Sequence, residues 1–426
     1  EPVAEIVNKG NLIIPHQSEN LILEGIEICF STDRGIGSSP CIVKNLTIKN
    51  SYIHDCEGYG ISLTGGENIE IRNNIFRRNS HGIVIGGAKN IKIEENEIGW
   101  NKIDGIDCAG NVRNLKISKN YIHHHFMFGH PDNIQFWGDV DGIEISDNVL
   151  IVSGQTLMSE DVSNIKLINN IVIGSGAYSL IIGGQKSALI YGTKKQTEED
   201  KKKWEEWESL PPDNVEINHN TVIATGYGPF NITAKGVKIF NNIIWPMHEY
   251  PIVYGITHRP TFSADYNLIW IGARTSQVLS NLKNDKLELN SYGEIPQFEN
   301  APFLFSIGWT ENSKEKIFLR EKIDDWKTGD FVEINMDGVV RKIKEVGDKY
   351  IIIEPCLEKI PDFEVFVFNW KGKSNFKWDL KLKENSSGYK KAEDGKNIGS
   401  DLNIQNYQKG DFNGDGKIDL PAKFRY

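Results

Sequence analysis

A short sequence unit recurs through the first 270 residues and limits the folds open to this chain. Each unit begins with an apolar–polar–apolar alternation, passes through a turn usually marked by Asn or Asp, and ends on further apolar residues. Eight segments show it: Leu46–Ile53, Ile69–Phe76, Ile91–Ile98, Leu115–Ile122, Ile143–Leu150, Ile165–Val172, Val215–Val222 and Val237–Ile244. The unit returns about every 22 to 28 residues, apart from one gap of about 50. A period of this length is typical of a solenoid.

The unit is best explained by three short strands per turn. The alternation indicates a strand with one buried face, and Asn turns the chain because it tolerates the left-handed backbone. A third apolar strand follows, at Gly60–Leu63, Gly82–Ile85, Gly105–Cys108, Asn133–Phe136 and Ser179–Ile182. Such strands cannot bury their faces alone, but stacked turns bury them and pair each strand with its copy about 4.8 Å away.

An asparagine column runs through the same repeats. Its members are Ser51 at the head, then Asn74, Asn96, Asn120, Asn148, Asn170, Asn220 and Asn242. Stacked amides can satisfy one another along such a column. The pattern resembles the right-handed parallel β-helix of the pectate lyase and polygalacturonase superfamily, over roughly residues 10–270. The second choice is a leucine-rich repeat, which would need a longer helical segment per repeat and an LxxLxLxxN frame, and both are absent. The predicted fold class is therefore all-β, a right-handed single-stranded parallel β-helix.

Three parts are expected along the chain. Residues 1–300 form the β-helix, with a helical insertion at 185–213; residues 301–375 form a small antiparallel β module; residues 376–426 form a closing segment and tail. The module is predicted from short alternating strands at Phe331–Ile334, Val339–Ile343, Tyr350–Ile353 and Val365–Phe368.

The insertion contains a charged segment that predicts a helix beginning after Thr197, a residue suited to the N-cap. Two interpretations stay open at this stage. The helix is either a solvated excursion or a lid that presents Trp204 or Trp207 beside a cleft.

Charge and hydropathy exclude several classes of partner. The chain has 48 Lys and Arg against 58 Asp and Glu, a formal net charge of −10, which disfavours nucleic acid and anionic lipid. No apolar run approaches the roughly 20 residues of a membrane span. The five cysteines contain no CxxC pair and indicate neither a disulfide scaffold nor a zinc module. A secreted protein whose signal peptide has been removed would have a sequence of this kind. We therefore expect the protein to be extracellular or at the cell surface.

Carboxylates gather on neighbouring third strands. Alternation points Asp107 and Gln135 outward, while Asp104 and Asp132 sit at the bends that enter these strands, with His130 nearby. Acids one turn apart repel, which raises at least one pKa. A protonated acid beside an ionised one is what glycosidic cleavage requires.

These considerations give a candidate site. The catalytic candidates are Asp104, Asp132 and His130, and the candidates for positioning a sugar are Asp107, Gln135, Trp137, Glu160 and Trp100.

The segment Lys102-Ile-Asp-Gly-Ile-Asp107 is similar to the Asn-Thr-Asp-Gly-Ile-Asp motif of polygalacturonase-type glycoside hydrolases. The resemblance implies that Asp104 and Asp132 match two of that family's three catalytic aspartates, and Pro131 stands in place of the third. The family's Gly-His-Gly and Arg-Ile-Lys motifs are absent, so galacturonan hydrolysis is not implied. His130-Pro-Asp132 is similar, in reversed order, to the Asp-Pro-His of alginate epimerases.

The tail resembles the calcium loop of an EF-hand or a dockerin. Asp411, Asn413, Asp415, Lys417 and Asp419 occupy the ligand positions, with a glycine at the sharp turn and Ala422 where a bidentate acid belongs. The resemblance implies a calcium ion; the alternative is an Asp/Gly-rich turn near the terminus.

The leading hypothesis is an extracellular enzyme that degrades a polysaccharide by means of paired carboxylates. Hydrolysis is favoured over elimination because the face is acidic, with only Lys102 and Arg113 near it. The alternatives are a non-catalytic glycan-binding or cell-surface β-helix, a polysaccharide lyase or epimerase, and a metal-handling protein that uses His130, Asp132 and one histidine of His123–His125.

Overall fold

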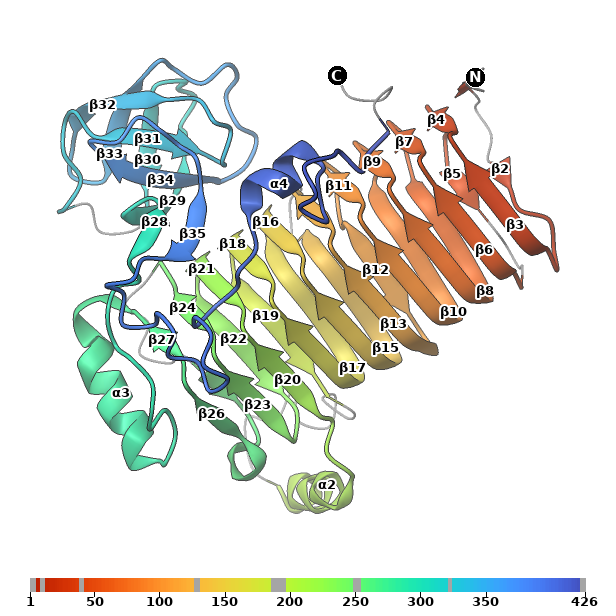
Figure 1. Ribbon diagram of the computed structural model, residues 1–426, viewed down its shortest axis with the longest axis horizontal. Helices are drawn as coiled ribbons and strands as arrows, with labels where there is room; N and C mark the ends of the chain where they lie inside the picture. Colours follow the sequence, from red (N-terminus) through yellow and green to blue (C-terminus); the bar gives the residue numbers. More distant parts are fainter. Residues whose placement is uncertain are drawn as a thin grey trace.

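The computed structural model contains an elongated stack of parallel strands with a small barrel beside its C-terminal end (Figure 1). It describes residues 5–7, 12–37, 42–125, 131–184, 197–247, 254–320 and 324–421. The predicted combination of parallel β-helix and antiparallel module is confirmed. No helix within these ranges is long and apolar enough to cross a membrane.

One sheet of the β-helix contains the short second strand of each turn. All eleven strands pair in parallel with the copy one turn away. They are β1 (Glu5–Val7), β4 (Glu27–Cys29), β7 (Tyr52–His54), β9 (Ile75–Arg77), β11 (Glu97–Gly99), β14 (Tyr121–His123), β16 (Val149–Ser153), β18 (Ile171–Ser175), β21 (Thr221–Thr225), β24 (Ile243–Trp245) and β27 (Leu268–Ile269).

The other sheet has 16 strands and supplies the remaining two faces. A long strand such as β8 joins the third strand of one turn to the first strand of the next through a bend at Gly65 and Gly66, both at positive φ. The strands are β2 (Leu12–Ile13), β3 (Glu19–Glu24), β5 (Arg34–Gly37), β6 (Lys44–Lys49), β8 (Tyr59–Arg72), β10 (His81–Glu94), β12 (Ile106–Ala109), β13 (Val112–Ser118), β15 (Asp132–Ser146), β17 (Gln155–Ile168), β19 (Tyr178–Gly183), β20 (Val215–Asn218), β22 (Gly228–Thr233), β23 (Val237–Phe240), β25 (Tyr254–Ile256) and β26 (Ser263–Asp265).

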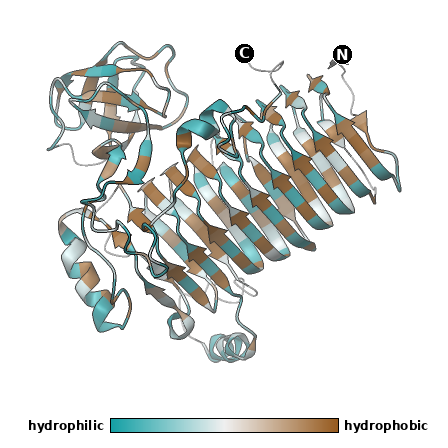
Figure 2. Cartoon of the chain, in the orientation of Figure 1, coloured by the Kyte–Doolittle hydropathy of each residue, from teal (hydrophilic) through white to brown (hydrophobic). Residues whose placement is uncertain are grey.

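Apolar side chains stack in register inside the helix. Ile83, Ile106 and Ile134 occupy equivalent positions on successive third strands and are fully buried. Figure 2 shows the same order as apolar bands that continue from strand to strand along the stack. Burial of like residues in each turn fixes the register, since a slip of one residue would turn every apolar side chain outward.

The predicted asparagine column is present and buried. From Asn96 through to Asn267, each Oδ1 accepts both the backbone N–H and the side-chain Nδ2 of the asparagine one turn earlier, at 2.8 to 3.1 Å. The backbone N–H of Ser51 bonds to Asn74 at the head of the column, as expected. Asn267 extends the column one turn beyond the predicted members.

Glycine at the entry to the third strand has a steric cause. A Cβ on Gly82 would lie 2.5 Å from the carbonyl oxygen of Gly105, and one on Gly105 would lie 2.6 Å from that of Asn133. Successive backbones approach too closely for a side chain at these two turns, which explains the glycine there, whereas the later turns have Asn133 and Ser179 at the same position.

The predicted helix of the insertion is α2 (Glu198–Ser209), and Thr197 forms a capping box with Asp200. At its other end the buried Lys235 donates to the carbonyls of Trp207 and Glu208, at 2.9 and 3.1 Å. Trp207 is only 1% exposed, so its ring packs the helix onto the stack rather than facing a cleft.

The C-terminal part folds back on the outer face of the short-strand sheet. Val149 and Ile171 of that face share a buried cluster with Phe305 and Trp378. The tail then runs back along the stack, where Tyr407 donates to the carbonyl of Asp147 at 2.5 Å.

The barrel is closed and antiparallel, in the order β29-β30-β33-β32-β31-β34. Its strands are β29 (Leu304–Trp309), β30 (Lys316–Leu319), β31 (Phe331–Ile334), β32 (Arg341–Val346), β33 (Tyr350–Glu354) and β34 (Val365–Lys371). The other elements are η1 (Arg259–Thr261), η2 (Gly272–Arg274), α3 (Thr275–Asn284), the pair β28 (Phe298–Asn300) and β35 (Asp379–Leu382), and α4 (Ile404–Lys409).

Candidate functional site

Three polar residues succeed one another where the third strands begin. Ile83, Ile106 and Ile134 are in register, so the residues two positions earlier, His81, Asp104 and Asp132, lie on successive turns. Regular stacking thus brings together side chains that are far apart in the sequence.

The two predicted catalytic aspartates are in contact through the backbone. The N–H of Asp132 donates to Asp104 Oδ1 at 2.8 Å, and Asp104 Oδ2 lies 3.7 Å from His81 Nε2. Asp104 is 3% exposed and Asp132 has no exposed surface. The pair therefore lies on one corner of the helix, enclosed by protein, and its catalytic role stays a prediction.

Asp107 lies beside this pair on the outer face of β12, half-buried. Burial raises the pKa of Asp107 to about 6, because desolvation disfavours the charged carboxylate. Its Oδ1 is buried and has no hydrogen-bond partner among the described residues. Burial also lowers the pKa of His81, so the imidazole is neutral at pH 7.

His81, Asp104 and Asp107 form a compact cluster. One ligand atom from each lies within 4.8 Å of the others, the single such group of three or more among the described residues. Carboxyl groups at about 5 Å suit a retaining glycosidase, whereas inverting pairs need roughly 6.5–9.5 Å. A histidine with two carboxylates is equally a donor set for a divalent cation. His81 is not among the site residues predicted from the sequence.

The other sugar-positioning candidates on the third strands share the face of Asp107. Gln135 pairs with Asp107 in register, and Trp137 pairs with Glu160 one turn further on. Gln135 is buried, while Trp137 is 40% exposed. The face therefore presents an open aromatic ring within one turn of the acids.

Two further candidates are not part of this cluster. Trp100 follows β11 of the short-strand sheet, where its ring stacks on His124 with centroids 4.3 Å apart. His130 lies outside the described residues, as does any metal site built on it. The rings of His123, His124 and His125 are all buried.

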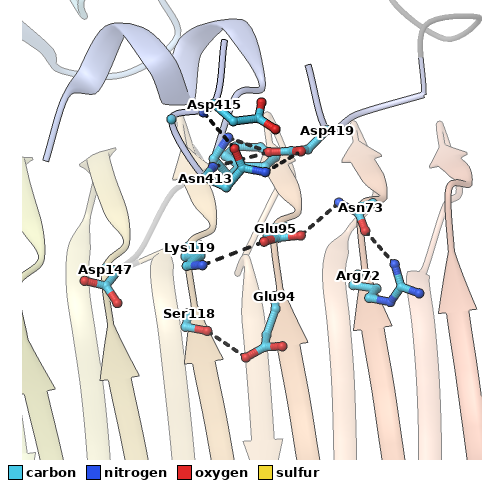
Figure 3. A network of polar contacts seen from close by, with 12 residues as sticks. Arg72, Asn73, Glu94, Glu95, Ser118, Lys119, Asp147, Asn413, Asp415 and Asp419 are labelled. Atoms are coloured by element: carbon cyan, nitrogen blue, oxygen red, sulfur yellow. Dashed lines mark hydrogen bonds and ion pairs between the residues drawn. The ribbon is translucent and has the colours of Figure 1, made fainter. Parts of the chain in front are cut away.

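The acidic side chains of the tail loop are engaged by the loop itself. Asp411 accepts from the N–H groups of Gly414 and Gly416, at 2.8 and 3.1 Å, and Asp419 accepts from Phe412 N–H at 2.7 Å. Figure 3 shows Asn413 and Asp419 turned toward each other, joined by the amide of Asn413 at 3.2 Å.

Two other predicted ligands of the loop are exposed. The Oδ1 of Asp415 accepts from the backbone N–H of Lys417 at 2.8 Å, and both side chains face solvent. The carboxylates of this loop do not gather as the His81 cluster does, within the described part of the chain. Calcium binding at the tail stays a prediction.

Comparison with known proteins agrees with this architecture. Residues 5–150 match the family model for the right-handed β-helix region, so the class of protein is a right-handed parallel β-helix. No curated protein matches the chain in sequence.

Two kinds of solved structure match the chain at low identity. A mutant of the periplasmic alginate epimerase AlgG is 19% identical, with a TM-score of 0.35, over 50% of this chain and 47% of that chain. A tailspike protein mutant of E. coli bacteriophage HK620, in complex with a pentasaccharide, is 10% identical, with a TM-score of 0.26, over 87% of both chains. The match thus spans less than half of the epimerase, and likeness at these identities concerns the fold alone.

Proposed function

We propose that this protein is an extracellular enzyme that cleaves a polysaccharide by hydrolysis of its glycosidic bonds. One observation carries the proposal. Asp107, a carboxyl whose pKa is raised to about 6, lies within 4.8 Å of a second carboxyl, on a face that also presents an exposed tryptophan. A carboxylic acid that holds its proton near neutral pH can protonate a leaving glycosidic oxygen.

In this proposal Asp107 is the general acid, because it is half-buried and reaches the surface, whereas Asp132 does not. Asp104 is enclosed by protein, so it would act through its negative charge near the oxocarbenium-like transition state and not by contact with the sugar. Asp132 holds Asp104 in place through its backbone N–H. This proposal revises the sequence-based one, in which Asp104 and Asp132 are the catalytic pair: Asp104 keeps a catalytic role, Asp132 becomes a positioning residue, and Asp107 becomes the proton donor.

Trp137 would provide the platform for a sugar ring. Its side chain is 40% exposed on the same face, and an aromatic ring offers a large apolar surface at a site where one edge stays wet. Glu160, paired with Trp137 across the turn, would accept hydrogen bonds from sugar hydroxyl groups.

A second candidate function rests on the same cluster. His81, Asp104 and Asp107 can hold a divalent cation, which would neutralise a uronate and favour elimination or epimerisation. In that case Asp104 and Asp107 are metal ligands, and neither acts as a general acid.

Product analysis separates these functions. The protein is incubated with a panel of neutral and uronate polysaccharides, with and without EDTA. A hydrolase produces new reducing ends without ultraviolet absorbance and resists EDTA. A lyase produces unsaturated, absorbing ends and loses activity with EDTA. Absence of any product from the whole panel would contradict the proposed hydrolase and favour a glycan-binding protein.

A further inference from the structure

A pocket of about 620 Å³ lies between the corner of the β-helix and the barrel. The helix contributes Pro131, Gly154, Ala177 and Tyr227, and the barrel side contributes Trp309, Arg320 and Phe363 among others. The volume falls within the range of about 300–1,000 Å³ that is typical of ligand sites.

The pocket continues the line of the acidic column. The position held by Asp104 and Asp132 at the start of each third strand is held on the next turns by Gln155, Tyr178 and Gly228. Four helix residues of the pocket each immediately precede one of these positions: Pro131, Gly154, Ala177 and Tyr227. The turns are about 4.8 Å apart, so the four steps from Asp104 to the turn of Tyr227 cover roughly 19 Å along the axis. An extended chain lying along this corner would reach from the turn of Asp107 to the pocket.

Two buried polar atoms in the pocket have no hydrogen-bond partner among the residues that the structure describes. Arg320 uses Nη2 to bind both oxygens of Glu364, at 2.8 and 2.9 Å. Its Nη1 and the hydroxyl of Thr310 are buried, and among the described residues neither has a hydrogen-bond partner. A buried polar group left unpaired costs about 1–3 kcal/mol, and a ligand with hydroxyl groups would satisfy both atoms.

Aromatic side chains complete the surface. Tyr227 is 51% exposed and Phe363 is 38% exposed, and the guanidinium of Arg320 lies 5.9 Å from the ring centroid of Tyr227. Rings beside hydrogen-bonding groups suit a sugar, which has apolar faces and a rim of hydroxyl groups.

The charge of the pocket favours a neutral sugar over a uronate. The only cation of the pocket's described lining that is charged at neutral pH, Arg320, is neutralised by Glu364, and Asp362 adds a further negative charge. The chain as a whole has a net charge of −10. A uronate would meet repulsion here, while a neutral sugar would not.

We propose that this pocket is a distal subsite for the substrate, and that the substrate is a neutral, hydroxyl-rich polysaccharide. The chain runs along the corner from the acids to the barrel, so the barrel is part of substrate recognition. This inference rests on the proposed function and specifies its substrate class.

Binding is measured by calorimetry on the full chain carrying Asp107→Asn, which prevents turnover. The probes are cellohexaose, xylohexaose, β-1,4-mannohexaose and hexagalacturonate. Two substitutions are added separately, Tyr227→Ala and Arg320→Gln, and Phe30→Ala serves as the control because Phe30 is an exposed ring far from the pocket's lining. Circular dichroism melting verifies that each variant is folded.

We expect at least one neutral hexaose to bind more tightly than hexagalacturonate. Tyr227→Ala and Arg320→Gln should each weaken that binding at least tenfold, with Phe30→Ala unchanged. Equal affinity in the pocket variants, tighter binding of hexagalacturonate, or no binding of any neutral probe would overturn the inference. Full turnover by the chain with Asp107→Asn alone would instead refute the proposed catalytic role, whatever the binding shows.

Discussion

The backbone N–H of Asp132 donates to the Oδ1 of Asp104 at 2.8 Å, across 28 residues of sequence. The bond joins adjacent turns at the corner where the third strands begin. It keeps one oxygen of Asp104 engaged, while the other faces His81. The stacking that builds the fold thereby also orients the charges of the candidate site.

Asp107→Asn is expected to slow cleavage strongly while leaving the fold intact. Amide and carboxyl have nearly the same shape, but the amide cannot donate a proton to a leaving oxygen, so the rate should fall about 10²- to 10⁴-fold. The measurement is release of reducing ends, together with a melting curve. Glu144→Gln, on the face of the first strands, is the matched control and should keep wild-type activity.

The activity of the wild-type protein is expected to decline as the pH rises through about 6. The pKa of Asp107 is raised to about 6 by burial, so the protonated acid is present below that pH and is lost above it. The observable is kcat/KM against pH. A kcat/KM that stays constant from pH 6 to pH 8 would rule out Asp107 as the general acid.

Asn120→Ala is expected to destabilise the protein by about 3 kcal/mol, because it orphans several buried polar groups. Asn120 accepts two bonds from Asn96 and donates to Asn148, all in the buried column. The exposed Asn114 bonds similarly to Asn90, and Asn114→Gly should cost less than about 1 kcal/mol, because water replaces the lost bond. Denaturant unfolding measures both. Equal losses would contradict the importance of the buried column.

Glu333 is expected to make the protein less stable as the pH rises from 4.5 to about 7. Burial raises the pKa of Glu333 from its ordinary value of 4.5 to about 7, although the indoles of Trp370 and Trp378 donate to its carboxyl. A raised pKa in the folded state favours folding below 4.5, and this advantage, on the order of 3 kcal/mol, is lost through 7. Melting temperature against pH is the measurement. Glu333→Gln should flatten the curve, and an unchanged slope would refute the assignment.

Calcium is expected to raise the melting temperature if the tail loop binds it, since a ligand of the folded state stabilises by mass action. The test compares melting in 1 mM EDTA with melting at increasing calcium concentrations. Asp411→Asn should remove the effect, because Asp411 occupies the first ligand position of the loop. Identical melting curves with calcium and with EDTA would leave the loop as an Asp/Gly-rich turn.

Much of the architecture could be predicted from the repeat. The asparagine column and the inward isoleucines follow from a period of two within strands and one unit per turn, and these are local properties of the sequence. The same alternation placed Asp107 and Gln135 on one outer face, where the structure has them in register.

The tertiary structure decided what alternation could not. Residues at bends have no fixed direction, so only the stacked backbone shows that Asp132 is enclosed while its N–H reaches Asp104. Tyr227 and Arg320 line the same pocket although they belong to different parts of the chain. The repeat pattern of the sequence could not predict that they lie together. The sequence by itself thus determined the repeating scaffold, because burial of apolar faces is a local pattern. The raised pKa of Asp107 and the place of the barrel depend on desolvation and packing between distant segments, which exist only in the folded chain.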